Sequence, residues 1–307
     1  MSALPAARVS DIHECSTPTP SPHVGGPINP PCSPTVLTNN LAQARATDQL
    51  TCTGSPATPN FIVTGSSTVL INGKMAARET DKTMHPPPGK IITGSSNVLI
   101  GGPTAGATLG NTKDGEKACQ DAAPGRKSSP KRDPKRPPTG QSYNNCGIES
   151  ARQIINQANR NQKNWTSVDE YGLFNFAISK GYATKDPNNH PRKSGGTNPA
   201  DRNSILNNYG VPSTLQSNSM ENIMQSVAEG KGVITSHDAV VLWGPKAPPG
   251  GHAITVIGVE YDANGNPINV IVNDTGTGEC GKKYPIATFQ NSLRSGRDIN
   301  VTTNPIW

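Results

Sequence analysis

Three residue types that can build a nucleophilic site follow one another along the second half of the chain. Cys146 opens the segment 146–158, where Ile and Ala recur every three or four residues, as on one face of an amphipathic helix. A thiol at a helix N-terminus lies at the positive end of the helix dipole, which favours the thiolate. About a hundred residues later, "GGHAITVIGVEY" and "PINVIVND" predict two strands that hold His252 and, at the end of the second, Asp274. Cys, His and a carboxylate in this order can act as nucleophile, base and orienting group.

Two supporting roles follow from neighbouring positions. Asn273 competes with Asp274 for the orienting role, and successive strand residues face opposite sides, so only one of them can reach His252. We favour Asp274 and keep Asn273 as the alternative. Gln141 precedes the cysteine by five residues and is expected to donate its amide to an oxyanion, whereas Trp243 is expected to pack beneath the site.

These residues carry a family resemblance that covers 141–307. The segment resembles papain-like cysteine peptidases, and more closely the bacteriocin-processing branch that cuts after double glycine. The resemblance rests on Gln141, "NCG" around Cys146, "GGHAITVIGV" around His252 and "VNDTGTG" around Asp274. It implies an α+β papain-like fold and a cysteine endopeptidase that needs no cofactor for catalysis. Two spacings depart from the family pattern: Gln141 is one residue closer to the cysteine, and the gap from His252 to Asp274 is longer.

The first hundred residues or so repeat one phrase three times. The copies are "AARVSDIHEC" (6–15), "QARATDQLTC" (43–52) and "AARETDKTMH" (76–85), each with Arg and Asp three residues apart. A second phrase, "SPTVLTNN", "SSTVLING" and "SSNVLIGG", repeats in step with the first. Repeats this short cannot bury a face alone, so we expect them to fold around a shared axis, with the Arg/Asp pairs tying neighbouring turns together.

Residues 4–103 resemble a PAAR domain, the cone that caps the spike of the type VI secretion system. The repeated Ala-Arg with its trailing Asp, "HVGGPI" at 23–28 and the "TVLI" phrases carry this resemblance. It implies an all-β cone with pseudo-threefold repeats, seated on a trimeric spike of valine-glycine repeat protein. It also implies a protein made in the cytoplasm and secreted by that machine into a recipient cell. The N-terminus shows no Sec-type signal pattern, which agrees with this expectation.

A metal site is expected in the cone. Repeat equivalence nominates Cys15, Cys52 and His85, each four residues past the Asp of its copy. The PAAR family pattern instead implies a structural zinc held by His13, His23, Cys52 and His85, and we favour this set.

Composition sets the domain organisation. We expect a PAAR domain at 1–103, a basic Pro/Ser-rich linker at 104–140 and a papain-like domain at 141–307. The segment 104–140 carries eight Lys or Arg against four Asp or Glu, so it accounts for most of the formal charge of +6. A solvated tether explains this charge, and we expect neither nucleic-acid binding nor a membrane span.

The six cysteines are interpreted as metal and catalytic residues rather than a disulfide framework, with the pairing of Cys15 and Cys32 left open.

The two resemblances together predict a PAAR-tipped antibacterial effector whose cysteine protease domain cleaves a protein of the recipient bacterium, with Gly-Gly bonds as the expected targets. Such an enzyme requires a cognate immunity protein over its cleft in the producing cell. Two alternatives remain open. The same residues could serve a deamidase, a transglutaminase or a cell-wall amidase. The second domain could also be a spike adaptor that processes itself, for example at "LIGG" (99–102).

Overall fold

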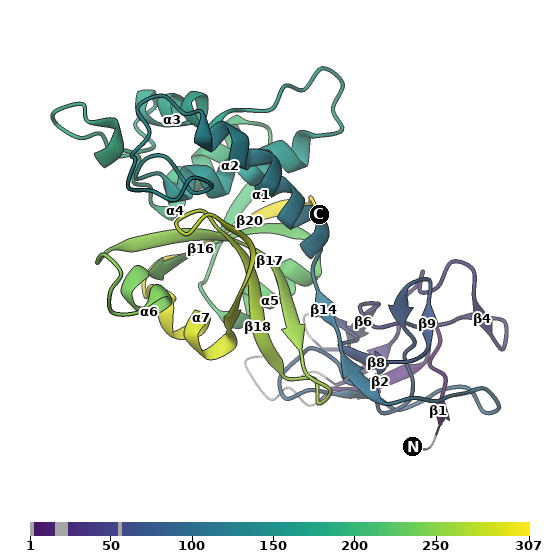
Figure 1. Cartoon of the computed structure of the whole chain (residues 1–307). Coiled ribbons are helices and arrows are strands. Elements are labelled where there is room, and N and C mark those ends of the chain that lie inside the picture. Colours follow the sequence, from purple (N-terminus) through teal and green to yellow (C-terminus); the bar gives the residue numbers. More distant parts are fainter. Residues whose placement is uncertain (1–2, 16–23, 55–56) are drawn as a thin grey trace. The chain divides into compact units, whose positions relative to one another are not determined.

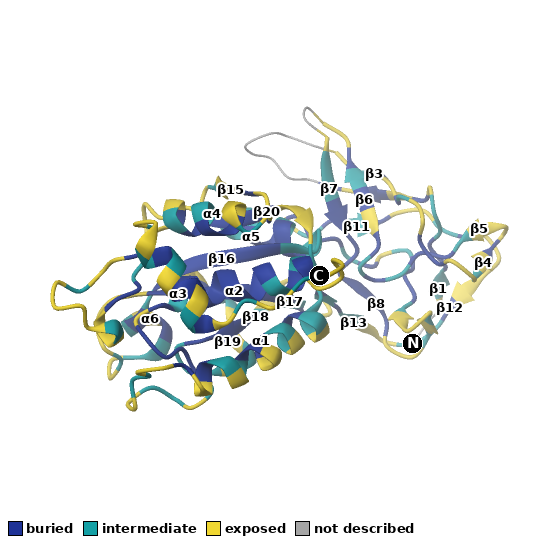
Figure 2. Ribbon diagram, turned by 90° about the horizontal axis from the view of Figure 1, so that it is seen from above, coloured by how far each residue is buried: buried dark blue, intermediate teal, exposed yellow. Residues whose placement is uncertain are grey.

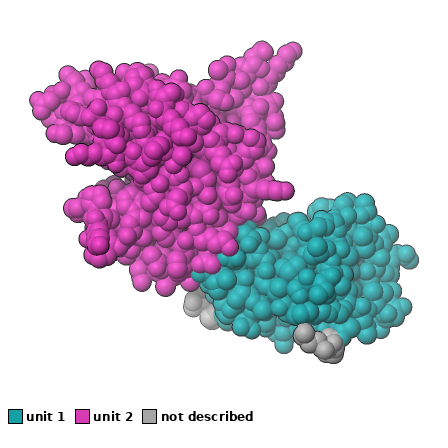
Figure 3. All heavy atoms as spheres, in the orientation of Figure 1, with its two compact units in different colours: residues 1–109, 259–268 teal, residues 110–258, 269–307 magenta. Residues whose placement is uncertain are grey.

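The computed structural model of the chain describes residues 3–15, 24–54 and 57–307. It divides into two compact units (Figures 1 and 3). Unit 1 comprises Met1–Leu109 together with Val259–Ile268, and unit 2 comprises Gly110–Gly258 together with Asn269–Trp307.

Unit 1 is built from short strands that pair in twos and threes. Most have only two to four residues, which matches the many Gly and Pro residues of this part of the chain. The strands are β1 (Leu4–Pro5), β2 (Ile12–Glu14), β3 (Gly26–Pro27), β4 (Leu37–Thr38), β5 (Leu41–Ala42), β6 (Gln49–Cys52), β7 (Thr58–Phe61), β8 (Thr64–Ser66), β9 (Leu70–Ile71), β10 (Lys74–Met75), β11 (Lys90–Ile91), β12 (Leu99–Ile100), β13 (Thr104–Gly106) and β14 (Thr108–Leu109). The pairs are β1 with β12, β9 with β10, β8 with β13, β4 with β5 and β6 with β7, and β2 lies between β3 and β11.

The three copies of the repeated phrase meet around one axis. Ala7 donates its backbone N–H to Ala77 (3.0 Å), Ala77 donates to Ala44 (3.0 Å), and Ala44 donates to Ala7 (2.9 Å). These alanines occupy the same place in each copy, so the hydrogen bonds close a ring. The predicted pseudo-threefold arrangement of an all-β unit is therefore confirmed.

Each repeat also closes its own Arg/Asp pair, as expected for a structural role. The Nε or Nη2 atom of each Arg lies 2.9–3.0 Å from the carboxylate three residues later: Arg8–Asp11, Arg45–Asp48 and Arg78–Asp81. The third pair is fully buried, and its Arg78 also donates to the carbonyl of Gly102 at 2.8 Å. A small apolar core lies beside these pairs: Ala7, Ile28, Cys32, Ala44, Leu50, Ile62, Ala77 and Ile91.

Unit 2 is an α+β domain built on one sheet, whose strands differ in length. The sheet has seven strands among the described residues, in the order β15-β20-β16-β17-β18-β19, with β14 pairing β17 at the part of that strand that belongs to unit 1. The strands are β15 (Ser213–Gln216), β16 (Lys231–Asp238), β17 (Gly251–Tyr261), β18 (Pro267–Asp274), β19 (Glu279–Pro285) and β20 (Ile299–Pro305). The helices are α1 (Thr112–Lys127), α2 (Cys146–Asn159), α3 (Glu170–Ser179), α4 (Pro199–Asn208), α5 (Met220–Ala228), α6 (Ala239–Trp243) and α7 (Ile286–Ser292), with a 3₁₀ turn at Pro191–Lys193.

Strand alternation assigns the two faces of this sheet. On β16, Ser236 accepts a hydrogen bond from α4, whereas its neighbour His237 contacts Ser292 of α7. Helices α2 and α4 therefore cover one face and α7 the other, as Figure 1 shows.

The predicted amphipathic helix forms α2, and its apolar face is the centre of the unit 2 core. The Ile and Ala positions that recur at helical spacing are fully buried: Ile148, Ala151, Ile154 and Ile155. They pack with Tyr143, Leu173, Phe174, Ile205, Leu206 and Ile234, and Figure 2 shows this inward burial along α2. The sheet and α2 together hold the two ends of the candidate site in fixed positions.

The segment 104–140 is not the solvated linker that composition predicted. It contains β13, β14 and the 16-residue helix α1, whose first turn is capped by Asn111. Arg126 of α1 is fully buried and lies 2.8 Å from Glu149 of α2. The basic residues that suggested a tether therefore include a core ion pair, whose acidic partner lies outside the segment and could not be recognised from local composition.

The interpretation of the cysteines needs a second correction. Cys119 of α1 and Cys280 of β19 form a disulfide, with an S–S distance of 2.02 Å, across 161 residues. Cys15, Cys32, Cys52 and Cys146 form no disulfide with a described residue. The pairing of Cys119 with Cys280 has no local sequence signal, because the fold alone brings α1 against β19.

No helix in the part of the chain that the structure describes is long and apolar enough to cross a membrane.

Candidate functional site

Cys146 is the first residue of α2, as the sequence predicted. The N-cap residue Asn145 makes no side-chain cap to this helix, since its side-chain oxygen accepts the backbone N–H of Tyr143 instead (3.2 Å). The first backbone N–H groups of an α-helix have no partner within the helix, and the thiol lies beside them. The local fold thus places a sulfur atom at a site with a positive electrostatic potential.

His252 and Asp274 reach each other from neighbouring strands. His252 lies near the start of β17, and its Nε2 atom is 2.8 Å from Oδ1 of Asp274 at the end of β18. The same carboxylate accepts hydrogen bonds from Trp243 Nε1 (2.8 Å), the Tyr284 hydroxyl (2.7 Å) and the backbone N–H of Gly276 (2.9 Å). Asp274 is completely buried, so these donors hold a charged carboxylate in a fixed orientation.

The pKa values of the three groups are displaced in the directions that a thiolate–imidazolium pair requires. Burial alone raises the pKa of Cys146, but the hydrogen bond and charge of His252, with the Ala253 N–H and Arg202, lower it to about 7. Burial alone lowers the pKa of His252, but Asp274 and then Cys146 raise it to about 9. Burial likewise opposes ionisation of Asp274, yet His252 and the donated hydrogen bonds hold its pKa well below the usual range.

Asn273, the alternative to Asp274, points away from the histidine. Its amide nitrogen donates to the carbonyl of Gly115 (2.8 Å) and to Gln153 (2.9 Å), and its oxygen accepts from the N–H of Gly281 (3.2 Å). Strand alternation separates the two neighbours, and the structure places Asp274 beside His252.

Gln141 is not at the cleft, contrary to prediction. Its side-chain nitrogen donates to the carbonyl of Tyr143 (3.1 Å), its oxygen accepts from Thr275 (3.0 Å), and it is almost fully buried. Gln141 is absent from the lining of the cleft that contains Cys146. An oxyanion donor must therefore come from other atoms.

Tyr284 and Arg202 contribute to this site without a signal in the sequence, and Trp243 has a role beyond the predicted one. Trp243 was expected only to pack beneath it; its ring does lie 4.5 Å from the His252 ring by centroids, but its N–H also holds Asp274. Tyr284 lies on β19, and nothing in its local sequence signals this contact. Arg202 lies on α4 and lowers the pKa of Cys146. Such roles depend on contacts between distant segments.

A cleft of about 380 Å³ opens beside the nucleophile. Cys146 and His252 both line it, together with polar and basic side chains that include Asn144, Arg202, Arg294 and Arg297. The acyl group of a peptide could therefore approach the sulfur atom from this side.

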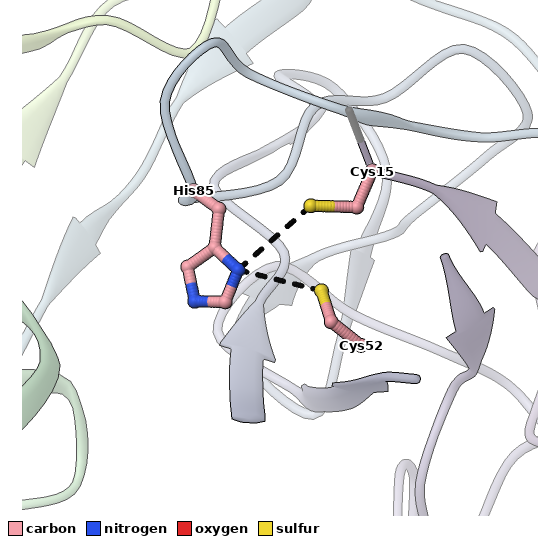
Figure 4. A group of neighbouring side chains, drawn as sticks. All are labelled: Cys15, Cys52 and His85. Atoms are coloured by element: carbon pink, nitrogen blue, oxygen red, sulfur yellow. Dashed lines mark hydrogen bonds between the residues drawn. The ribbon is translucent and has the colours of Figure 1, made fainter. Parts of the chain in front are cut away.

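A second cluster of reactive side chains lies inside unit 1. Cys15, Cys52 and His85 are buried, and their ligand atoms all lie within 4.8 Å of one another (Figure 4). His85 Nδ1 is 3.3 Å from the Cys52 sulfur and 3.8 Å from the Cys15 sulfur. His13 Nε2 also lies 3.3 Å from the Cys52 sulfur.

The cluster contains the whole repeat-equivalent set and also three members of the favoured set, His13, Cys52 and His85. His23, the remaining member of the favoured set, lies outside the described residues. Two thiols and two imidazoles are the donors that zinc accepts in a closed tetrahedral site. His13 is oriented for this by its Nδ1 atom, which lies 2.8 Å from the Gly26 carbonyl. The residues present therefore fit a structural metal ion.

Two family models match this chain. The PAAR motif matches residues 18–86, and the Peptidase_C39 like family matches residues 131–297. A PAAR motif implies association with a secretion spike and is known to bind a metal. In combination with a C39-like cysteine peptidase domain, it indicates a peptidase effector associated with type VI secretion.

Individual relatives are more distant. Uncharacterized proteins of Mycobacterium tuberculosis and Mycobacterium bovis are 25% identical over 186 residues, which span 53% of this chain and 78% of theirs. The structure of a C39-like peptidase from Bacillus anthracis is 13% identical over 53% of this chain and 90% of its own, with a TM-score of 0.38. The Salmonella effector SpvD is 12% identical over 64% and 85%, with a TM-score of 0.29. Since the family match covers more than half of its residues, this chain belongs to the Peptidase_C39 like family.

Proposed function

We propose that this chain is a type VI secretion effector that rides on the spike through its PAAR unit and cleaves a protein inside a recipient bacterium through unit 2. The observation that supports this most strongly is the connected series Cys146, His252 and Asp274 at the edge of a cleft. The pKa displacements of these groups favour a thiolate nucleophile at neutral pH.

The mechanism uses the resting thiolate–imidazolium pair. The Cys146 sulfur attacks the peptide carbonyl carbon, and the carbonyl electron pair moves onto its oxygen. His252 then gives its proton to the leaving amine nitrogen as the C–N bond breaks, which leaves a thioester. Water attacks the thioester, His252 accepts the water proton, and the C–S bond breaks to restore the thiolate. Asp274 holds the imidazole ring throughout.

The oxyanion needs hydrogen-bond donors in place of Gln141. The backbone N–H of Cys146 at the start of α2 is one of them. Asn144 is exposed, lines the cleft and lies two residues before the nucleophile, so its side-chain amide can act as the other. We assign the second donor role to Asn144.

The target compartment follows from cysteine chemistry. Structural disulfides persist in oxidising compartments and are rare in the bacterial cytoplasm. The Cys119–Cys280 disulfide of unit 2 therefore favours the recipient's periplasm as the place of action. A producing cell then needs an immunity protein that covers the Cys146 cleft in that compartment.

The preferred bond is proposed from the family resemblance alone, as one that follows Gly-Gly. The alternative in which the chain processes itself at "LIGG" (99–102) is disfavoured. Leu99 and Ile100 form β12, paired with β1, and the carbonyls of Gly101 and Gly102 accept hydrogen bonds from Ser66 (2.7 Å) and Arg78 (2.8 Å). A protease requires an extended, unpaired chain at the bond it cleaves.

Expression of the full chain in a susceptible bacterium tests the proposal. The wild type and Cys146→Ala are directed separately to the cytoplasm and to the periplasm. We expect the wild type alone to arrest growth, in the periplasm, and new protein N-termini to accumulate there. Arrest by Cys146→Ala equal to the wild type would overturn the proposal.

The products separate the remaining chemical alternatives. Two fragments of one target protein identify a protease. A target of unchanged length with a small mass gain identifies a deamidase, a mass gain from a joined amine identifies a transglutaminase, and released cell-wall peptides identify an amidase.

A further inference from the structure

Four arginine side chains in the described structure are buried to within a few per cent, and one of them differs from the others. Arg78 pairs with Asp81, whereas Arg126 and Arg152 both pair with Glu149. Arg202 is equally buried, with 2% of its surface exposed, but it forms no ion pair with any described residue. Buried guanidinium groups are normally paired, because removing a charge from water is costly.

Arg202 is instead held by neutral groups and directed toward the cleft. Its Nε atom donates to Asn300 (2.8 Å) and its Nη2 atom donates to Ser236 (2.8 Å). No acceptor among the described residues contacts its Nη1 atom, and the side chain lines the same cleft as Cys146. Burial lowers the pKa of Arg202 to about 10, so the group remains a cation at neutral pH.

The close approach of Arg202 to the nucleophile depends on a glycine. A Cβ atom at Gly147, the residue after Cys146, would lie 2.9 Å from Cδ of Arg202 and 2.1 Å from the Thr197 hydroxyl. The chain therefore has no side chain where this arginine passes α2.

Two more arginines line the cleft at its rim. Arg294 and Arg297 are exposed and lie between α7 and β20. The backbone N–H of Arg294 donates to Ser236 (2.9 Å), and its Nη1 atom lies 2.2 Å from the position that a Cβ of Gly251 would take. This guanidinium therefore lies against the backbone immediately before His252. Neither rim arginine is held in an ion pair by the residues that the structure describes.

Carboxylates at the cleft are fewer than its arginines. Asp201 lines it, but its carboxylate accepts the backbone N–H of Asn198 (2.8 Å) as part of the cap of α4. Asp298 lines the neighbouring pocket that also includes Arg297. Three guanidinium groups thus face a cleft whose own lining includes a single carboxylate.

We propose that the cleft recognises a carboxylate of the polypeptide substrate next to the bond that is cleaved, with Arg202 as the buried anchor and the rim arginines as additional contacts. This inference rests on the proposed peptidase function. The carboxylate could belong to an Asp or Glu side chain or to the end of a peptide chain. In either case, a charge-assisted pair would use the Nη1 donor that no described residue engages.

Arg202 could instead serve only to stabilise the Cys146 thiolate, since it contributes to the low pKa of that thiol. The two roles differ in what they change. A thiolate-stabilising arginine affects every substrate equally and moves the pH profile. An anchor for substrate carboxylates changes the ratio of cleavage between acidic and neutral peptides.

The test is a cleavage profile of the full-length wild-type protein on a peptide library made from bacterial proteins. We expect Asp or Glu to be enriched at one fixed position beside the cleaved bond. Matched peptides with that residue changed to Asn or Gln should then lose about tenfold or more in kcat/KM, as for loss of a charged hydrogen bond. A parallel set with free and amidated C-termini identifies a terminal carboxylate as the recognised group.

Variants assign the effect to the cleft. Arg202→Met should abolish the preference between matched acidic and neutral peptides, and Arg294→Ala with Arg297→Ala should reduce it. Arg192→Ala, an exposed arginine outside the cleft, is the control and should preserve it. If Arg202→Met does not fold, the variants Arg294→Ala and Arg297→Ala test the proposal instead, and an unreduced preference for acidic peptides in them would overturn it.

The outcomes are distinct for the two proposals. Absence of any cleavage by the wild type overturns the peptidase function itself. Cleavage without a preference for either carboxylate source overturns the inference alone. If Arg202→Met keeps the preference and changes only the pH profile, Arg202 serves to stabilise the Cys146 thiolate. This result also overturns the inference of carboxylate recognition.

Discussion

The charge state of Cys146 is set by residues from separate segments of the chain. His252 comes from β17, Arg202 from α4, and the orienting carboxylate Asp274 from the end of β18. These segments meet because α2 and α4 pack against one face of the sheet. At this scale the protein is a buried network of charges rather than a single reactive side chain.

A pH profile is the direct consequence at the residue scale. Cleavage needs the thiolate of Cys146 and the protonated ring of His252. Activity should therefore rise as pH increases through about 7, where the thiol loses its proton, and fall through about 9, where the imidazolium loses its own. At two pH units below the thiol pKa, we expect about a hundredfold lower kcat/KM.

The measurement is kcat/KM for one uncharged peptide across this range, with the rate of thiol alkylation as an independent probe. Asp274→Asn is the informative variant. Removal of the carboxylate charge lowers the pKa of His252, so the alkaline limb should move to lower pH. An unchanged alkaline limb in this variant would contradict the assignment of that limb to His252 paired with Asp274.

At the scale of secondary structure, α1 belongs to unit 2. Its residue Gly115 accepts a hydrogen bond from Asn273 of β18, its Arg126 pairs with Glu149 of α2, and Cys119 is joined to β19. The helix therefore connects the element that carries the nucleophile with the strands that carry and support Asp274. A truncated unit that begins at residue 141 would lack all three contacts.

Loss of the disulfide should weaken unit 2 measurably. Cys119→Ser with Cys280→Ser is expected to lower the free energy of unfolding by about 2–5 kcal/mol, because the bond closes a long loop and restricts the unfolded chain. Urea unfolding monitored with and without a reducing agent gives the value. The reductant should destabilise the wild type and leave the double variant unchanged. Equal sensitivity of both proteins would show that another thiol is responsible.

At the scale of the whole molecule, each unit depends on a different stabilising device. Unit 2 has a large apolar core around α2, whereas the apolar core of unit 1 has fewer residues and half of them are Ala or Cys. A unit with little apolar surface to bury gains proportionally more from a metal ion. We propose that the cluster of Cys15, Cys52, His85 and His13 holds that ion.

Metal removal should therefore act on one unit only. We expect about one zinc per chain by elemental analysis. Chelation should lower the unfolding temperature of unit 1 by about 10 °C or more, with unit 2 unchanged. Cys52→Ser should lose the metal, whereas Cys32→Ser, a buried cysteine outside the cluster, should keep it. Retention of the metal by Cys52→Ser would contradict the site.

Local patterns in the sequence were sufficient for several features. The threefold repeat, the buried face of α2 and the candidate residues Cys146, His252 and Asp274 are all contained in short motifs or in a fixed period. Such features depend on interactions between residues a few positions apart, or on copies of one phrase. A reader of the sequence can recognise them because chain order and spacing already carry the information.

Other features depended on the folded chain. Gln141 was assigned to the oxyanion, yet its amide is held by Tyr143 and Thr275. Arg202 reaches the cleft although it precedes His252 by fifty residues, and helix α1 was interpreted as a tether. The direction of a side chain and the partner of a charge or thiol are settled by packing between segments far apart in the chain. Composition and spacing do not record that packing, so these contacts could be identified only from the three-dimensional arrangement.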